Sequence, residues 1–358
     1  MFDYPKRVRL LRGMLEKNRL DGFVTLFTPH LRYLTGYSGS NGLCLVTNSD
    51  VFFLTDFRYK EQIQQEVTCS RSFVTSGNLV EKAAARKLLR GCKRVGIEKD
   101  NLYVGQFLEL RSNFPGVRFV PTTEYVESFA AIKNETEISL IRNAIQITDA
   151  VFAKVLKSIR PGISELDVSA EISYYHKKFG AEKDSFEPIV VSGSRASLPH
   201  GRPSSKRIKN RELVTLDLGC IYNGYCSDLT RTIAVGKASA EERKVYDIVL
   251  KAQQLAIDSA KSGLAGRRLD GVARNYIRSR GYGKYFGHGL GHGIGLEIHE
   301  APRVSARSLH TLSDGNVVTV EPGIYLPGKF GVRIEDDIVV RDGGCEVLTT
   351  APKTLIVL

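Results

Sequence analysis

Tryptophan is absent from the sequence, methionine occurs only twice, and no long apolar run is present. No segment approaches the ~18 consecutive apolar residues that cross a bilayer, so we expect no membrane partner. The basic residues within 1–7 are not followed by an apolar stretch, which argues against a secretory signal. The six cysteines are scattered without a C-x-x-C pair, which disfavours a disulfide scaffold and predicts a reduced, cytoplasmic protein.

The remaining composition is that of a folded protein with a basic surface. Apolar residues make up 42% of the chain, which excludes disorder, and 358 residues are enough for two hydrophobic cores. The net charge of +12 raises nucleic acid as a partner, but the charge is spread evenly and forms no basic tail or aromatic-rich basic motif. We therefore expect no specific nucleic-acid binding.

The first 130 residues have the pattern of a small α/β domain. A helix is predicted from Pro5, with Val8, Leu11 and Leu15 on one face. Apolar segments broken by Gly, Asn and Asp predict the other elements. These are strands at 23–27, 43–47, 51–54 and 94–97 and a helix at 82–89. We place a domain boundary near residue 130, which gives domains of 1–130 and 131–358.

Strong helix signals follow this boundary. Asn134 and Glu137 form a predicted capping box, after which apolar positions alternate three and four apart until the Pro-Gly pair at 161–162. A similar cap at Ser164 begins the next helix, which Gly180 ends. Two further helices are predicted at about 239–262 and 268–280.

The second domain contains a weak internal repeat, in which segment 213–219 (LVTLDLG) resembles segment 317–323 (VVTVEPG). Each predicts a strand with an acid near its end, Asp217 or Glu321. Each is followed by a turn and a second strand that carries another acid, Asp228 or Glu335. If the two halves face each other, four carboxylates come together.

These acids alternate with apolar residues, so their face of each strand is expected to be at least half buried. Buried carboxylates need a partner or a cation. The run Glu335-Asp336-Asp337 makes this need acute, because three adjacent acids repel one another. The charges alone favour an alternative, a solvated turn or salt bridges to Arg231 and Arg333.

The histidines change the balance between these interpretations. Three of the seven, His288, His292 and His299, fall within one Gly-rich stretch, and His200 lies in a second motif, LPHGRP. The glycines allow the backbone to approach whatever the imidazoles contact. Three histidines in twelve positions, together with four strand acids, indicate a metal site with acid–base groups around it.

Four carboxylates and one imidazole are mainly hard ligands. They favour Mn²⁺, with Co²⁺ or Zn²⁺ as alternatives, over a thiolate zinc site. Five such side chains can hold two divalent ions if some carboxylates bridge, which is the arrangement found in aminopeptidases.

The residues around these acids and His292 resemble those of the M24 metallopeptidases, and most closely the aminopeptidase P/prolidase branch. The segments 32–42 (RYLTGYSGSNG) and 198–203 (LPHGRP) are similar to that branch too. The resemblance covers essentially the whole chain. It implies an α/β N-terminal domain followed by an α+β "pita-bread" (creatinase/aminopeptidase-like) catalytic domain with a pseudo-twofold internal repeat.

Carried over residue by residue, the resemblance implies five metal ligands. Asp217 would chelate one ion, Asp228 and Glu335 would bridge both, and His292 and Glu321 would hold the other. It also implies catalytic roles near the substrate for His200, His288, His299, Glu321 and Arg333, and it matches Tyr325 to the tyrosine after the Glu-Pro-Gly turn. No ligand is missing, which argues against the metal-free and non-enzymatic relatives that share this fold.

The implied activity is dinuclear metal-dependent hydrolysis of the Xaa-Pro bond in proline-containing peptides. Metals would activate water and polarise the carbonyl, Glu321 could accept a proton, and the histidines could stabilise the intermediate. We expect an Xaa-Pro aminopeptidase, with a prolidase that cuts only dipeptides as the alternative. A non-catalytic basic binding module on the same fold is the alternative from another class. The resemblance also implies a homodimer.

Overall fold

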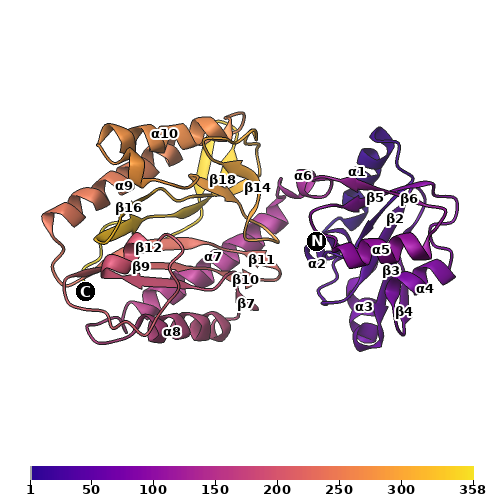
Figure 1. Cartoon of the computed structure of the whole chain (residues 1–358), viewed down its shortest axis with the longest axis horizontal. Coiled ribbons are helices and arrows are strands. Elements are labelled where there is room, and N and C mark those ends of the chain that lie inside the picture. The colour runs from indigo at the N-terminus through magenta and orange to yellow at the C-terminus, as the bar shows by residue number, and fades with distance from the viewer. Residues whose placement is uncertain (1) are drawn as a thin grey trace. The chain divides into compact units, whose positions relative to one another are not determined.

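The computed structural model describes residues 2–358 and forms two compact units, Met1–Ala130 and Ala131–Leu358, which Figure 1 shows. Within the described part of the chain, no helix combines the length and apolar character needed to span a bilayer. All six cysteines are free thiols.

The first unit is a mixed sheet with helices around it. Its strands are β1 (Gly22–Thr25), β2 (Leu43–Thr47), β3 (Val51–Asp56), β4 (Arg71–Thr75), β5 (Arg94–Glu98) and β6 (Arg118–Thr122). Its helices are α1 (Tyr4–Lys17), α2 (Thr28–Thr35), α3 (Lys60–Glu66), α4 (Leu79–Ala85), α5 (Val104–Asn113) and α6 (Glu127–Ala130).

The strand order in this sheet is β4-β3-β2-β1-β5-β6. The pairs β1–β2 and β2–β3 are antiparallel, whereas β4 pairs in parallel with β3, β5 with β1, and β6 with β5. Helix α1 buries Val8, Leu11 and Leu15, the face that the apolar spacing predicted. The predicted helix at 82–89 is misplaced, because Asn78 caps an earlier start and the chain turns after Ala85.

The second unit holds four α-helices and thirteen strands in its described residues. The helices are α7 (Glu135–Val155), α8 (Glu165–Lys178), α9 (Ala240–Ser259) and α10 (Gly266–Ser279). The strands are β7 (Lys183–Asp184), β8 (Ile189–Ser192), β9 (Glu212–Leu218), β10 (Cys220–Tyr222), β11 (Tyr225–Cys226), β12 (Leu229–Val235), β13 (Gly291–Gly293), β14 (Glu300–Val304), β15 (Val317–Val320), β16 (Gly323–Leu326), β17 (Phe330–Arg333), β18 (Asp336–Arg341) and β19 (Gly344–Val347).

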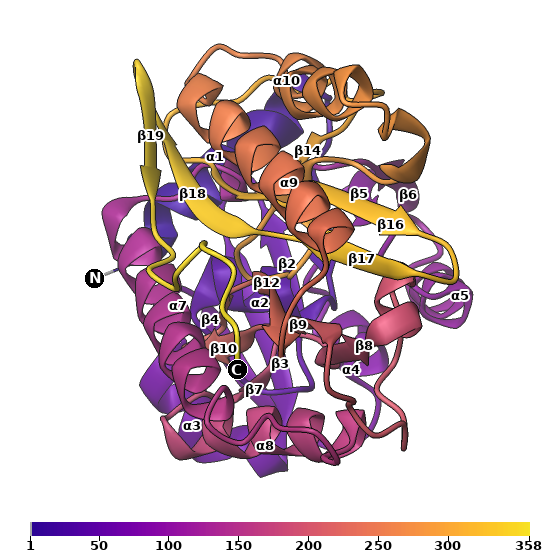
Figure 2. The ribbon, with the colours of Figure 1, turned by 90° about the vertical axis from the view of Figure 1, so that its left-hand side faces the viewer.

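The helices form two outer layers with the strands between them. Figures 1 and 2 show α7 and α8 on one side of the strands and α9 and α10 on the other. Phe152 of α7 and Ile172 of α8 pack against strands β8, β9 and β12 in one core. Val249 of α9 and Ala273 of α10 pack against strands β15 to β18 in another. Each half of the repeat thus has its own helix pair and its own core.

The two halves meet edge to edge between strands β12 and β17. The backbone N–H of Arg333 donates to the hydroxyl of Thr232 at 3.1 Å, and that hydroxyl donates to the carbonyl of Arg333 at 3.0 Å. Just beyond β17, the backbone N–H of Glu335 donates to the carbonyl of Thr230 at 3.1 Å. These contacts set the acids of the second half beside those of the first.

Several details differ from the sequence-based expectations. Helix α7 ends at Val155, before the Pro-Gly pair, since a tight turn follows it. Glu335 was expected within a strand, but it lies between β17 and β18. Glu321 lies just after β15 rather than inside it. Asp228, which was also expected within a strand, lies just before β12. These three acids therefore stand where a strand begins or ends.

Candidate metal centre

Three side chains at the junction of the two halves come close enough to share one ion. Ligand atoms of Asp228, His292 and Glu335 all lie within 4.8 Å of one another, and the three residues are buried. Nε2 of His292 is 3.7 Å from Oδ2 of Asp228 and 3.7 Å from Oε1 of Glu321. Asp217 lines the same cavity, so all five residues predicted to bind metal are gathered in one place.

Strand β13 holds His292 between Gly291 and Gly293, two positions that have no room for a side chain. A Cβ atom on Gly291 would lie 2.0 Å from the carbonyl oxygen of Thr319, and one on Gly293 would lie 2.2 Å from that of Ala301. The N–H of His292 donates to the hydroxyl of Thr319 at 3.2 Å. Glycine is therefore required here for close packing of strands.

The carboxylates repel one another strongly. Burial raises the pKa of Glu335 to about 8, and the charge of Asp217 adds to this effect. Burial and the neighbouring Glu335 also hold the pKa of Asp228 and of Glu321 well above the usual range. Burial lowers the pKa of His292 to about 3, so its imidazole is neutral and offers no compensating charge.

These residues fit a pair of divalent cations. Oδ1 of Asp217 is buried and makes no hydrogen bond to any described residue, as expected of an atom that has another partner. A neutral imidazole is the form that binds metal, and carboxylates with one imidazole suit Mn²⁺, Co²⁺ or Zn²⁺. Divalent ions bound to these side chains would therefore replace the mutual repulsion of the carboxylates with attraction to the ions.

A chain of hydrogen bonds extends from Asp217 to the rim of the cavity. Nη2 of Arg333 donates to Oδ2 of Asp217 at 2.6 Å, and its Nη1 donates to the hydroxyl of Tyr325 at 2.8 Å. That hydroxyl is 2.9 Å from Nε2 of His288. Burial lowers the pKa of His288 to about 4, so this imidazole is also neutral.

A cavity of about 520 Å³ opens over these groups. It is lined by every residue predicted to be catalytic or metal-binding, and His200 and His299 stand exposed at it. The roles of all these predicted residues stay predictions. The nine residues are His200, Asp217, Asp228, His288, His292, His299, Glu321, Arg333 and Glu335.

Sequence reasoning missed several residues of the cavity wall, including Phe186, Ile189 and Arg303. Arg303 is exposed, and no acidic side chain among residues 2–358 pairs with it. The sequence signal that could have identified Arg303 as part of the cavity wall is its position four residues after His299. Arg202, in the LPHGRP motif, also lines the cavity; it lies 3.7 Å from Glu187, and its side chain is 84% exposed.

The acidic run 335–337 satisfies both interpretations, each for a different residue. Asp336 forms the salt bridge to Arg231 at 2.8 Å, as the alternative without metal predicted. Glu335 instead faces the cavity. Asp337 accepts a hydrogen bond from the N–H of Asp228 at 3.0 Å, and burial and the neighbouring Glu335 raise its pKa.

Two family profiles together match almost the whole chain. The profile of metallopeptidase family M24 matches residues 139–342, and that of the creatinase/prolidase N-terminal domain matches residues 7–131.

Individual relatives are similar over their full length. The Xaa-Pro dipeptidase of Pyrococcus horikoshii is 38% identical over 98% of this chain and 99% of its own. An Xaa-Pro dipeptidase structure from Bacillus anthracis superposes with a TM-score of 0.97, at 42% identity, over 99% of this chain and all of that one. The X-Pro aminopeptidase structure from Thermotoga maritima gives a TM-score of 0.90, at 37% identity, over 96% of this chain and all of that one.

Proposed function

The chain belongs to metallopeptidase family M24, in its aminopeptidase P/prolidase branch, and from this premise we propose that it hydrolyses Xaa-Pro dipeptides. The observation that carries the proposal is the match, end to end, to Xaa-Pro dipeptidases from Pyrococcus and Bacillus. From the sequence we expected longer peptides to be the better substrates. The names of these relatives favour dipeptides instead.

Asp217, Asp228, His292, Glu321 and Glu335 would hold two divalent ions, of which Mn²⁺ is the best match to the donor set. Bound there, the ions would lower the pKa of a water molecule and polarise the scissile carbonyl. Proline explains the need for a dedicated site, because the Xaa-Pro bond has no N–H for a general peptidase to bind.

The other side chains would orient groups and handle protons. Arg333 holds Asp217 through one donor and Tyr325 through another, which fixes the Asp217 carboxylate in one orientation. The carboxylate of Glu321 borders the cavity and can accept a proton from the attacking water. The neutral imidazole of His288 donates its one N–H, at Nδ1, to the carbonyl oxygen of Gly289, so its Nε2 accepts from the hydroxyl of Tyr325 and orients that hydroxyl beside Arg333.

The charge of Arg303 supports a short substrate. A dipeptide carries a free carboxylate directly after proline, and a guanidinium without an acidic partner is suited to bind it. Arg333 is already committed to Asp217, and Arg202 lies near Glu187. Arg303 is therefore the cation of the cavity wall that is best placed to select for a terminal carboxylate.

A second candidate is an Xaa-Pro aminopeptidase acting on longer peptides. It is supported by the similarity to the X-Pro aminopeptidase structure from Thermotoga maritima. A longer peptide places an amide where the dipeptide has its carboxylate, so Arg303 would then contribute little to binding.

Kinetics with Mn²⁺ on matched Xaa-Pro and Xaa-Pro-Yaa peptides test the proposal. We expect kcat/KM for the dipeptide to be ~100-fold higher than for the tripeptide, because one charge-assisted bidentate contact has an effect of about this size. Arg303→Gln should remove most of this preference, and Arg202→Gln, which changes a more exposed arginine of the same wall, should keep it. A tripeptide cut as well as the dipeptide would favour the aminopeptidase.

The homodimer and the cytoplasmic location stay predictions. Light scattering coupled to size-exclusion chromatography tests the first, since a mass near twice 39.7 kDa is expected.

A further inference from the structure

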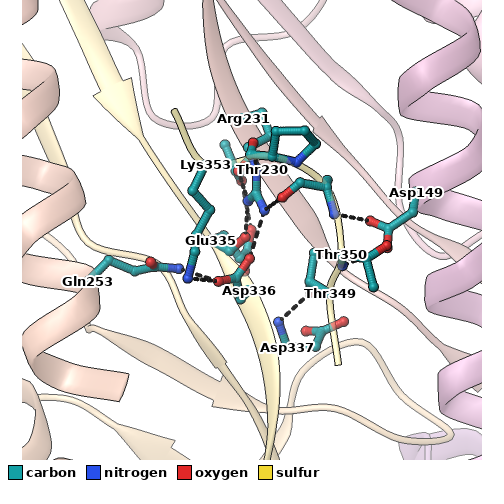
Figure 3. A network of polar contacts seen from close by, with 12 residues as sticks. Asp149, Thr230, Arg231, Gln253, Glu335, Asp336, Asp337, Thr349, Thr350 and Lys353 are labelled. Carbon is teal, nitrogen blue, oxygen red and sulfur yellow. Dashed lines mark hydrogen bonds and ion pairs between the residues drawn. The ribbon is translucent and has the colours of Figure 1, made fainter. Parts of the chain in front are cut away.

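Behind the acid cluster, away from the cavity, a buried arginine joins three segments of the second unit. Arg231 lies in β12, and its side chain is 1% exposed. Its five N–H groups are all used, for its Nε donates to Pro352 and its two Nη atoms donate to Thr230, Glu335, Asp336 and Ala351. Figure 3 shows this guanidinium between the strand that bears Thr230 and the segment that bears Glu335.

Asp336 is the anionic centre of this network. Its Oδ1 accepts from Arg231 at 2.8 Å, and its Oδ2 accepts from Nε2 of Gln253 at 2.9 Å and pairs with Nζ of Lys353 at 2.8 Å. Figure 3 shows Gln253 and Lys353 reaching the carboxylate together. Asp336 is thus fixed from β12, from α9 and from the segment 349–353.

That segment is itself anchored. Asp149 of α7 accepts hydrogen bonds from the N–H and hydroxyl of Thr350, at 2.8 and 2.6 Å. The hydroxyl of Thr349 accepts from the N–H of Asp337 at 3.0 Å. The network therefore connects helices α7 and α9 to the residues that flank Glu335.

Glu335 is held from both ends by this arrangement. Its carbonyl accepts from Arg231, and its Oε2 accepts from the hydroxyl of Thr230 at 2.7 Å, the residue whose own carbonyl also binds Arg231. A displacement of Asp336 by a fraction of an ångström would move its neighbour Glu335 by a similar amount. Metal ligands tolerate little such movement, because their geometry is set by contacts outside the ligand shell.

We propose that Arg231, Asp336, Gln253 and Lys353 are positioning residues that set the geometry of Glu335 for metal binding. The inference rests on the ligand set proposed above, but it is independent of which peptide is cut. The proposal also predicts the direction in which metal affinity changes when these residues are replaced. Arg231 and Lys353 bring two positive charges to one carboxylate, so electrostatics alone would make them weaken the binding of a cation.

Two variants test the proposal without opening the fold at Arg231. Gln253→Leu removes one hydrogen bond to Asp336 with no change of charge, and Gln254→Leu, at the neighbouring partly exposed position, is its control. Lys353→Met removes the ion pair to Asp336, and Lys329→Met, which breaks the surface pair with Glu241, is its control. Lys353→Arg is the conservative variant expected to restore binding.

The measurement is Mn²⁺ affinity by calorimetry without substrate, together with the unfolding temperature of each metal-free variant. We expect Gln253→Leu and Lys353→Met to bind Mn²⁺ about 10- to 100-fold more weakly than their controls. Unchanged affinity with a lowered unfolding temperature shows a structural role only and overturns the proposal. So does tighter binding by Lys353→Met, the result of a purely electrostatic effect. Failure of the wild type to cut Xaa-Pro peptides while it binds Mn²⁺ would refute the proposed function and leave this inference intact.

Discussion

Nη2 of Arg333 lies 2.6 Å from Oδ2 of Asp217, although the two residues are 116 positions apart in the chain. Each belongs to a different half of the repeat, and both are largely buried. The pair neutralises one carboxylate of the cluster and leaves Oδ1 of Asp217 without a hydrogen bond among the described residues. One oxygen of Asp217 is thus used by the protein, and the other is the one that would bind an ion under the proposed ligand assignment.

Loss of a proposed bridging ligand should abolish both metal binding and activity. We expect Asp228→Asn to bind at most one ion and to have almost no peptidase activity, because its carboxylate lies beside His292 and Glu335. Exhaustive chelation of the wild type should have the same effect, and added Mn²⁺ should reverse it. Metal analysis and a peptidase assay measure both, with Asp258→Asn on the surface of α9 as control. Full activity after chelation would refute the ligand assignment.

His288 should affect catalysis without holding metal. It lines the cavity, but both of its ring nitrogens have protein partners, since Nε2 is 2.9 Å from the hydroxyl of Tyr325 and Nδ1 is 2.7 Å from the carbonyl oxygen of Gly289. We expect His288→Ala to lower kcat by ~10²- to 10⁴-fold with metal content retained, and we expect the same of His200→Ala and His299→Ala. His292→Ala should instead lose metal. A His288→Ala protein that lacks stoichiometric metal would show that the division between ligands and catalytic histidines is wrong.

The metal-free protein should become less stable as the pH rises from 6.5 to 8. Burial raises the pKa of Glu335 to about 8, so folding favours its protonated form, and that stabilisation is lost as the pH rises through the folded pKa. The expected slope is up to ~1.4 kcal/mol per pH unit for each such group. The histidines with lowered pKa oppose this trend near pH 6.5, where they are still about half protonated in the unfolded chain, and their effect fades toward pH 8, where they are neutral in both states.

Urea unfolding at several pH values, with chelator present, measures this slope. Glu335→Gln should flatten it, whereas Glu241→Gln, an exposed glutamate, should leave it unchanged. Saturating Mn²⁺ should reverse the trend, because binding requires the ionised carboxylates. Metal-free protein that gains stability between pH 6.5 and 8 would contradict the prediction.

Two glycines near the histidines should respond very differently to substitution. Gly291→Ala would place a Cβ 2.0 Å from the carbonyl oxygen of Thr319, so β13 must separate from β15. We expect a loss of several kcal/mol in unfolding free energy, on the scale of overpacked cores, together with weakened metal binding. Gly287→Ala meets nothing within 4 Å and should be nearly neutral. Similar stabilities of the two variants, measured by urea unfolding, would contradict the assigned packing role.

Much of the fold was predictable from local pattern. The capping box at Asn134 and Glu137 is formed as predicted, because both of its hydrogen bonds join residues three positions apart. The buried face of α1 followed from apolar spacing alone. Helix α4 was misplaced because its start depends on the single side chain of Asn78. Strand β4 was missed, since it is largely exposed and has no apolar alternation.

The sequence by itself determined which residue types could form the site, because four acids near strand ends and a glycine-spaced histidine cluster indicate hard metal ligands. Only the tertiary structure decided their roles. The acids 335–337 are adjacent in the chain, yet one faces the cavity, one is fixed by Arg231, and one binds the backbone of Asp228. That division depends on which segments lie within ~3 Å of each carboxylate, and contacts over 100 positions apart leave no periodic signal in the sequence.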